Sequence, residues 1–218
     1  MKKILWLSII VASIFAYACN PKVTKSEKKQ DTLSAYYSKK LKIVQPLNTG
    51  GNDMVYVTFD EVLSELRASY HKIETIDKQV IDGKDTLQLH ETYYCLHDSS
   101  LRVPARYMGP WGSAITKNFV ANTFATKIIV IRNKDTVLNK VFKKEEFNKV
   151  LWNRLKQYAI IFTADYLGYD KTKGEFGIGY SITIPLTDVG LGAGIAVSKT
   201  GKYRILDEYS KTDSFKKD

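Results

Sequence analysis

The chain has 218 residues, of which 44% are hydrophobic and 26% charged, so wholesale disorder, a collagen-like repeat and a low-complexity polymer are excluded. Two cysteines are too few for a disulfide-scaffolded miniprotein, and the length favours one compact domain. A net charge of +10, from 33 Lys and Arg against 23 Asp and Glu, calls for an anionic partner without identifying it.

Residues 1–18 are typical of a secretory signal peptide. Met1-Lys2-Lys3 precedes an apolar run from Ile4 to Ala18, which two serines interrupt. The run is shorter than the roughly 20 apolar residues that a membrane-spanning helix needs. A positively charged start, a short apolar stretch and small residues at its end predict a segment that is removed after export.

The segment ends in Ala16-Tyr17-Ala18-Cys19, which resembles the lipobox of bacterial lipoproteins, although Ala16 stands where the commonest form has Leu. The resemblance implies that Cys19 carries acyl chains such as palmitate, and two or more chains make a stable anchor. The alternative is an ordinary Ala-x-Ala cleavage site that leaves a free Cys19 thiol. Asn20, rather than Asp, favours an outer-membrane anchor facing the periplasm, with surface display left open.

Composition divides the remainder of the chain into a tether, a body and a tail. Residues 19–34 comprise the lipidated cysteine and a polar, charged segment that cannot bury enough surface to order itself. Residues 35–209 are expected to form a single β-rich domain, and residues 210–218 a polar tail.

The first predicted elements of the body are a helix and a hairpin. Thr58 with Glu61 three residues later is a capping-box pattern, so a helix is expected to begin there. Asp82-Gly83 then separates two alternating segments, residues 71–81 and 86–96, which predicts a β-hairpin.

The loop over residues 106–113 concentrates Tyr107, Met108 and Trp111 among turn residues. Exposed aromatic side chains in a loop can stack on a sugar or a partner chain, which makes Tyr107 and Trp111 candidate ligand-binding residues. The alternative is that the loop folds back as a lid on the core.

A second hairpin and a second helix follow. Asn133-Lys134-Asp135 separates strands predicted over 127–132 and 136–142. The helical spacing of Phe147, Val150, Leu151, Leu155 and Tyr158 then predicts an amphipathic helix.

Three strands complete the body. Apolar residues alternate strictly with glycine or polar residues over 175–184. One face of this predicted strand is therefore apolar and consists of Phe176, Ile178, Tyr180, Ile182 and Ile184. The glycines of residues 190–194 precede a strand rather than a helix, so they suit a strand entry better than a phosphate loop. Lys199-Thr200-Gly201 predicts the last hairpin. The expected fold class is α+β, mainly antiparallel β, with two short helices, as a sandwich or as a curved sheet wrapped on a helix.

One strand carries side chains that could perform chemistry. Alternation places Glu91, Cys95 and His97 on the same face, and a thiol, an imidazole and a carboxylate can form a Cys-His nucleophile or a metal site. Residues two apart on a strand are about 6.5–7 Å apart, which is long for a direct thiolate–imidazole contact. The alternative is a buried, unreactive Cys95 with a hydrogen-bonded His97.

Other catalytic and nucleic-acid motifs are absent from the sequence. There is no Walker A loop and no G-x-S-x-G, and His90-Glu91 lacks the second histidine of a zinc protease because Tyr94 stands in its place. Basic residues are interspersed with acidic ones and form no nucleic-acid-binding motif. An exported protein is also in a different compartment from the chromosome. No metal, cofactor or catalytic residue is assigned on these grounds.

Four strings resemble uncharacterised lipoproteins of Bacteroides-type bacteria: the Cys19 lipobox and residues 93–100, 128–136 and 180–190. The resemblance covers roughly residues 70–206. It implies a compartment and a fold class and transfers no activity.

The sequence therefore predicts a lipid-anchored envelope protein whose β-rich domain is a non-enzymatic binding module. Its expected partners are the membrane, through the anchor, and an envelope protein or an anionic glycan, but not nucleic acid. The alternative is an envelope enzyme that uses Cys95 and His97, or His90.

Overall fold

The computed structural model describes residues 44–48, 54–207 and 215, which all belong to the compact unit formed by residues 41–218. The predicted signal peptide, Cys19 and the tether lie outside the described residues. The elements are β1 (Val44–Asn48), β2 (Met54–Thr58), α3 (Phe59–Ser69), β3 (Ile73–Asp82), β4 (Asp85–Cys95), β5 (Leu101–Pro104), η2 (Ala105–Tyr107), η3 (Gly109–Ala114), β6 (Asn118–Ala121), β7 (Phe124–Arg132), β8 (Asp135–Lys143), η4 (Lys144–Phe147), α4 (Asn153–Tyr158), β9 (Ile160–Asp170), β10 (Glu175–Thr183), β11 (Gly190–Ser198) and β12 (Tyr203–Leu206).

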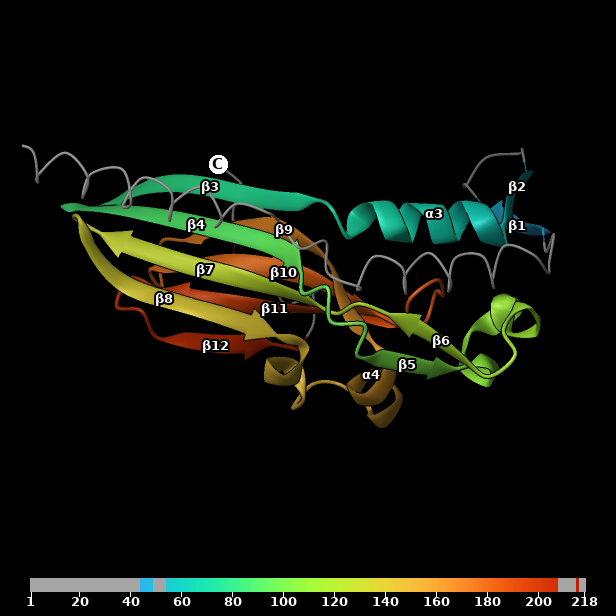
Figure 1. Cartoon of the computed structure of the whole chain (residues 1–218). Coiled ribbons are helices and arrows are strands. Elements are labelled where there is room, and N and C mark those ends of the chain that lie inside the picture. The colour runs from blue at the N-terminus through green and yellow to red at the C-terminus, as the bar shows by residue number, and fades with distance from the viewer. Residues whose placement is uncertain (1–43, 49–53, 208–214, 216–218) are drawn as a thin grey trace, which may run out of the picture. The chain divides into compact units, whose positions relative to one another are not determined.

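Two antiparallel four-stranded sheets, ordered β3-β4-β7-β8 and β12-β11-β10-β9, form the body of the fold (Figure 1). They pack face to face, since the Tyr93 hydroxyl on β4 lies 2.9 and 2.8 Å from the carbonyl oxygens of Ile161 and Phe162 on β9. The pairs β1-β2 and β5-β6 are separate two-stranded sheets. The predicted α+β class, mainly antiparallel β, is confirmed, and the sandwich is the correct alternative.

Strict alternation in the sequence places the core correctly on both sheets. On β10, the side chains of Phe176, Ile178, Tyr180 and Ile182 are fully buried between the sheets. On β4, every second side chain from Leu87 to Cys95 is buried. One apolar face per strand therefore builds the sandwich interior.

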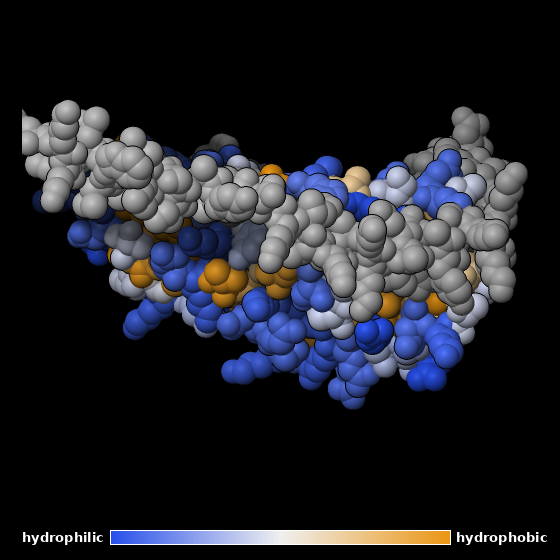
Figure 2. All heavy atoms as spheres, in the orientation of Figure 1, coloured by the Kyte–Doolittle hydropathy of each residue, from blue (hydrophilic) through white to orange (hydrophobic). Residues whose placement is uncertain are grey.

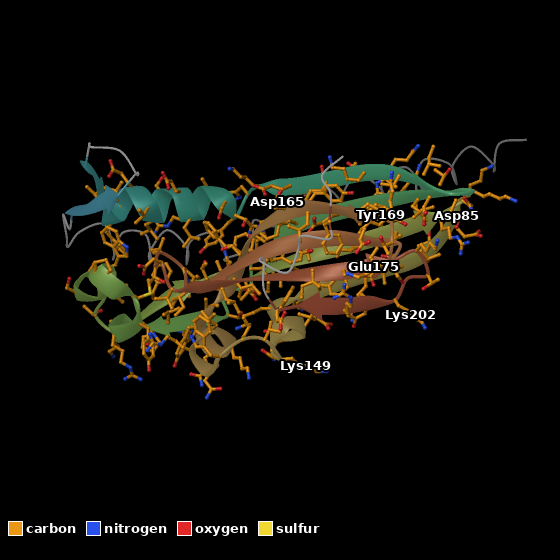
Figure 3. All side chains as sticks on the ribbon, turned by 180° about the vertical axis from the view of Figure 1, so that it is seen from behind. Asp85, Lys149, Asp165, Tyr169, Glu175 and Lys202 are labelled. Atoms are coloured by element: carbon orange, nitrogen blue, oxygen red, sulfur yellow. The ribbon has the colours of Figure 1, made fainter. Side chains whose placement is uncertain are left out.

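The three predicted hairpins are confirmed as β3–β4, β7–β8 and β11–β12. Their turns need left-handed backbone, which Gly83, Asn133 and Gly201 adopt with φ values of 65°, 51° and 80°. At this end of the sandwich Asp82 accepts hydrogen bonds from Lys199 Nζ at 2.8 Å and from the Tyr169 hydroxyl at 3.0 Å, which ties the two sheets together. Figure 3 shows Tyr169 near this end.

The predicted capping box is confirmed at the start of α3. The Glu61 N–H donates to the Thr58 hydroxyl at 3.2 Å, and the Thr58 N–H donates to the Glu61 carboxylate at 2.6 Å. The helix buries Phe59, Leu63 and Leu66. No helix in the described part of the chain is long and apolar enough to cross a membrane.

The single helix predicted over residues 147–158 is wrong. The segment forms η4, a turn and α4, because Trp152 adopts extended backbone with φ −80° and ψ 165°. Phe147, Leu151 and Leu155 nevertheless face the core, as their spacing predicted. The two short helices η4 and α4 bury the same side chains as one continuous helix would. The spacing of the apolar residues therefore predicted the buried side chains correctly but not the continuous helix.

Candidate anion-binding site

Cys95 and His97 do not form a side-chain pair. Cys95 ends β4 with 6% of its surface exposed, whereas His97 lies beyond the strand, is exposed and has a φ of 51°. Their contact is a hydrogen bond of 3.4 Å from the His97 backbone N–H to Cys95 Sγ. Burial raises the pKa of the Cys95 thiol despite this bond, which makes it a poor nucleophile.

Glu91 belongs to the sandwich core rather than to a site around Cys95. Four residues along a strand separate the two by roughly 13 Å. Glu91 is 1% exposed, and its Oε1 accepts hydrogen bonds from the hydroxyls of Thr126 at 2.6 Å and Tyr180 at 2.9 Å. Burial raises the pKa of this carboxyl, against the effect of both hydrogen bonds. Through its hydrogen bond with Tyr180 on β10, this carboxyl joins the two sheets.

The three histidines of the chain do not form a metal site with any other described residue. The ring centroids of His71 and His97 are 6.0 Å apart, and His90 pairs with Asp77 on the outer face of the β3–β8 sheet. No group of three or more His, Cys, Asp or Glu side chains in the described part of the chain is placed to hold a metal ion.

The two aromatic candidates of the loop have different surroundings. Trp111 on η3 is 5% exposed, and its ring centroid lies 5.7 Å from that of Phe59 on α3. It therefore covers the core as a lid. Tyr107 on η2 is only half-buried. The structure thus leaves Tyr107, and not Trp111, available at the surface.

Two arginines and a second tyrosine surround Tyr107. The Cζ atoms of Arg106 and Arg154 lie 4.8 and 4.9 Å from the centroid of the Tyr107 ring. The ring of Tyr158 lies 5.1 Å from that of Tyr107 at an interplanar angle of 34°. These four residues, Arg106, Tyr107, Arg154 and Tyr158, are called the arginine–tyrosine cluster.

Two short elements with buried anchors position the cluster. Arg154 and Tyr158 are four residues apart on α4, so they share one helix face. Leu155 between them is fully buried and fixes that helix on the core. Met108, directly after η2, is also fully buried and fixes the backbone beside Tyr107. The cluster is therefore exposed but held by rigid supports.

The charge of the cluster is not neutralised within the described residues. No carboxylate of the described part of the chain lies within 4.0 Å of either guanidinium, whereas Arg132 and Arg204 at the other end pair with Asp85 and Glu175. Figure 2 shows mostly hydrophilic side chains over the surface that α4 and β5 occupy in Figure 1. Guanidiniums that no carboxylate neutralises can bind carboxylate or phosphate groups from a ligand.

Sequence reasoning identified one member of this cluster and missed three. Tyr107 was selected because it lies in an aromatic loop, and Tyr158 was counted in the apolar stripe of a helix. Arg106 and Arg154 carry no distinguishing pattern among 33 basic residues. The useful signal was the spacing of Arg154 and Tyr158, which places them together on any helix that contains both.

Comparison with known proteins adds no family. No protein-family model matches the chain. A search of curated proteins gives no match either. The resemblance to Bacteroides-type lipoproteins therefore stays a prediction.

Proposed function

We propose that the chain is a lipid-anchored protein of the bacterial envelope whose β-sandwich binds an anionic glycan through the arginine–tyrosine cluster. The observation that supports this function best is the pair of guanidiniums over the Tyr107 ring, neither of which forms a salt bridge with a carboxylate in the described part of the chain. The net charge of +10 favours the same class of partner over long distances, and removal of Lys2 and Lys3 with the signal peptide would leave +8, from 31 basic minus 23 acidic residues.

Each part of the cluster suits one part of such a ligand. A guanidinium offers planar N–H donors that fit the two oxygens of a carboxylate or phosphate. The Tyr107 ring holds both guanidiniums in place, and the half-exposed Tyr158 ring beside it offers apolar surface to sugar C–H groups. Because α4 and η2 are anchored by Leu155 and Met108, the cluster loses little freedom when a ligand binds.

The predicted anchor and this site support each other. Acylation of Cys19 would hold the domain at a membrane surface, where phosphate- and carboxylate-bearing glycans are abundant neighbours. Attachment to that surface also raises the effective concentration of such ligands, so weak binding at one site is sufficient.

The site is tested by titrating the purified protein with two anionic glycans, polygalacturonate for carboxylates and lipopolysaccharide for phosphates, and with neutral dextran. We expect binding to at least one anionic glycan, and none to dextran. Arg106→Gln with Arg154→Gln should weaken binding at least tenfold, because a hydrogen bond to a charged group contributes about 1.5–3 kcal/mol.

A second double variant separates the site from general charge attraction. Lys84→Gln with Lys134→Gln removes the same charge from exposed hairpin turns at the other end of the sandwich (Figure 1). We expect this variant to bind as the wild type does. Equal weakening by both double variants, or no binding to either anionic glycan, would contradict the proposed site.

The anchor has its own test. Wild-type protein should fractionate with the membrane and carry an acyl mass increment on Cys19, whereas Cys19→Ser should be released into the soluble fraction. A Cys19→Ser protein that stays with the membrane would exclude the anchor and leave the glycan site untouched.

A further inference from the structure

The edge strands of the two large sheets differ in length and regularity. β12 has only four residues, and β8 and β9 are bulged, because their registers with β7 and β10 shift. β3 has ten residues, and its register with β4 runs unbroken from Ile73 to Asp82. Short or bulged edges resist pairing with another chain, whereas a long regular edge favours it. Among the described edge strands of these two sheets, β3 is therefore best suited to accept a further strand (Figure 1).

The hydrogen bonds of β4 show which backbone groups of β3 point to its open side. The Thr86 carbonyl on β4 accepts from the Asn133 N–H at 2.9 Å, and the Thr86 N–H donates to the Asn133 side chain at 2.8 Å. Both groups of Thr86 therefore point away from Ile81, its partner on β3. In such a non-hydrogen-bonded pair, the N–H and C=O of Ile81 also point away from β4. Because this direction alternates along a strand, five residues present both groups at the open edge: Ile73, Thr75, Asp77, Gln79 and Ile81.

Two exposed isoleucines lie at the ends of this edge. The side chains of Ile73 and Ile81 are 70% and 69% exposed, more than any other large hydrophobic side chain in the described part of the chain. One exposed isoleucine is ordinary on a protein surface. Here two of them flank a regular open edge at equal distances from Asp77, four residues to either side. The edge therefore has a pattern that is symmetric about its middle residue.

We propose that β3 is a dimerisation edge, at which two copies of the chain pair antiparallel about a two-fold axis at Asp77. This register places Ile73 opposite Ile81 of the second copy, Thr75 opposite Gln79, and Asp77 opposite itself. The β3–β8 sheets of the two copies then form one continuous sheet. The inference concerns a surface separate from the arginine–tyrosine cluster and does not depend on the proposed glycan binding.

A second copy fits this edge because the edge is complementary to itself. Every residue whose N–H and C=O point outward faces another such residue, which allows hydrogen bonding along the whole strand. The exposed isoleucines meet each other at both ends, and apolar pairs directly opposite each other stabilise a sheet. A register shift of two residues in either direction would place each isoleucine opposite a polar residue or beyond the strand. The pattern therefore selects one register.

The charges of β3 are compatible with this register. On the inner face of the strand, Glu74 lies diagonally from Lys78 of the second copy, and the two-fold axis makes this opposite-charge pair occur twice. Asp77 meets itself at the axis, which is unfavourable for two carboxylates. However, the Asp77 carboxylate is bonded to His90 on β4, so it is held toward its own sheet and away from the open edge.

Disulfide crosslinking of the full chain in the cell envelope tests the register. Asp77→Cys places one cysteine of each copy at the axis, where hydrogen-bonded partners have Cα atoms about 5.5 Å apart, within reach of a disulfide. Gln79→Cys is the matched control on the same face of β3, because its two copies lie four residues apart along the paired strands, roughly 13 Å. After oxidation, Asp77→Cys should give roughly tenfold more linked dimer than Gln79→Cys or than wild type, whose Cys95 is buried.

A mixture of variants identifies the partner strand. Chains with Thr75→Cys and chains with Gln79→Cys, produced together, should link to each other, although neither should link to itself. Ile81→Lys in the Asp77→Cys chain should reduce the linked dimer roughly tenfold, because it places a charge opposite Ile73 at both ends of the interface. Val141→Lys, at an exposed position of β8, should leave the linked dimer unchanged. Thermal unfolding checks that both lysine variants are folded.

Four results would overturn the proposal. They are equal linking of Asp77→Cys and Gln79→Cys, no link between the Thr75→Cys and Gln79→Cys chains, an unchanged linked dimer in the Ile81→Lys chain, and a link from Asp77→Cys to a different protein in place of a second copy. None of these results bears on the arginine–tyrosine cluster, because its four residues lie on η2 and α4.

Discussion

Replacement of Glu91 by glutamine should stabilise the protein at neutral pH. The carboxyl lies between the two sheets, where Thr126 and Tyr180 donate to Oε1, while Oε2 has no hydrogen-bond partner. Glutamine has the same shape and keeps a carbonyl oxygen for both hydroxyl groups. It cannot ionise, so it removes the cost of placing a charge in the core.

The sign of the effect follows from the direction of the pKa shift. Burial raises the pKa of Glu91 in the folded protein above its ordinary value, so the folded state holds the proton more tightly than the unfolded chain does. The contribution of this group is fully present below the unfolded pKa and is lost as pH rises through the folded pKa. Wild-type stability should therefore fall with rising pH over this window, relative to Glu91→Gln.

The magnitude comes from the charge alone, because the Oε2 position lacks a hydrogen-bond partner and the glutamine amide would lie in the same place. An unsatisfied buried polar group costs about 1–3 kcal/mol in either residue, and the ionised carboxylate adds a further cost of the same order. We expect Glu91→Gln to exceed wild type by about 1–3 kcal/mol at pH 7 and by much less at pH 4. Urea unfolding at pH 4, 5, 6, 7 and 8 gives the difference at each pH.

Glu65→Gln on the exposed side of α3 is the matched control, because it makes the same chemical change where water solvates the carboxylate. Its free energy of unfolding at pH 7 should differ little from that of wild type. Parallel pH curves for wild type and Glu91→Gln, or a less stable Glu91→Gln at pH 7, would refute the reasoning.

Three further predictions concern the cap, the lid and the thiol. Thr58→Ala removes the N-cap of α3 and should lower the free energy of unfolding by about 1 kcal/mol in urea, whereas an exposed Ser64→Ala should change it little. Trp111→Ala opens a cavity against Phe59 and should cost about 3 kcal/mol, and a loss below 1 kcal/mol would contradict the lid. In a Cys19→Ser background, iodoacetamide should modify Cys95 far more slowly in native protein than in urea, and equal rates would show an accessible thiol.

Local patterns were sufficient for the elements whose stability is local. The capping box at Thr58 and Glu61 lies within one helical turn, and the glycine or asparagine turns need only neighbouring residues. Alternation on β4 and β10 identified the buried face because the side chains of a strand point to opposite sides by geometry. These features were predicted correctly because no distant contact is needed to specify them.

The helical spacing of the apolar residues could not by itself determine the backbone conformation between residues 147 and 158. The predicted stripe of Phe147, Leu151 and Leu155 is buried, but the chain adopts η4, a turn and α4. A six-residue helix has little stability of its own, so the packing of these side chains decides where the helix breaks.

The order of the residues was sufficient to predict a β-rich domain, because apolar and polar residues alternate along its strands. The composition was sufficient to show a surplus of positive charge. Only the tertiary structure decided which charges matter. Arg106 and Arg154, which are 48 positions apart in the sequence, lie over the same tyrosine ring. Trp111 is buried, whereas Tyr107 is half-exposed. The Phe215 ring packs against Gly177. Contacts between segments so far apart depend on how the sheets and short helices pack, and no spacing within the sequence encodes them.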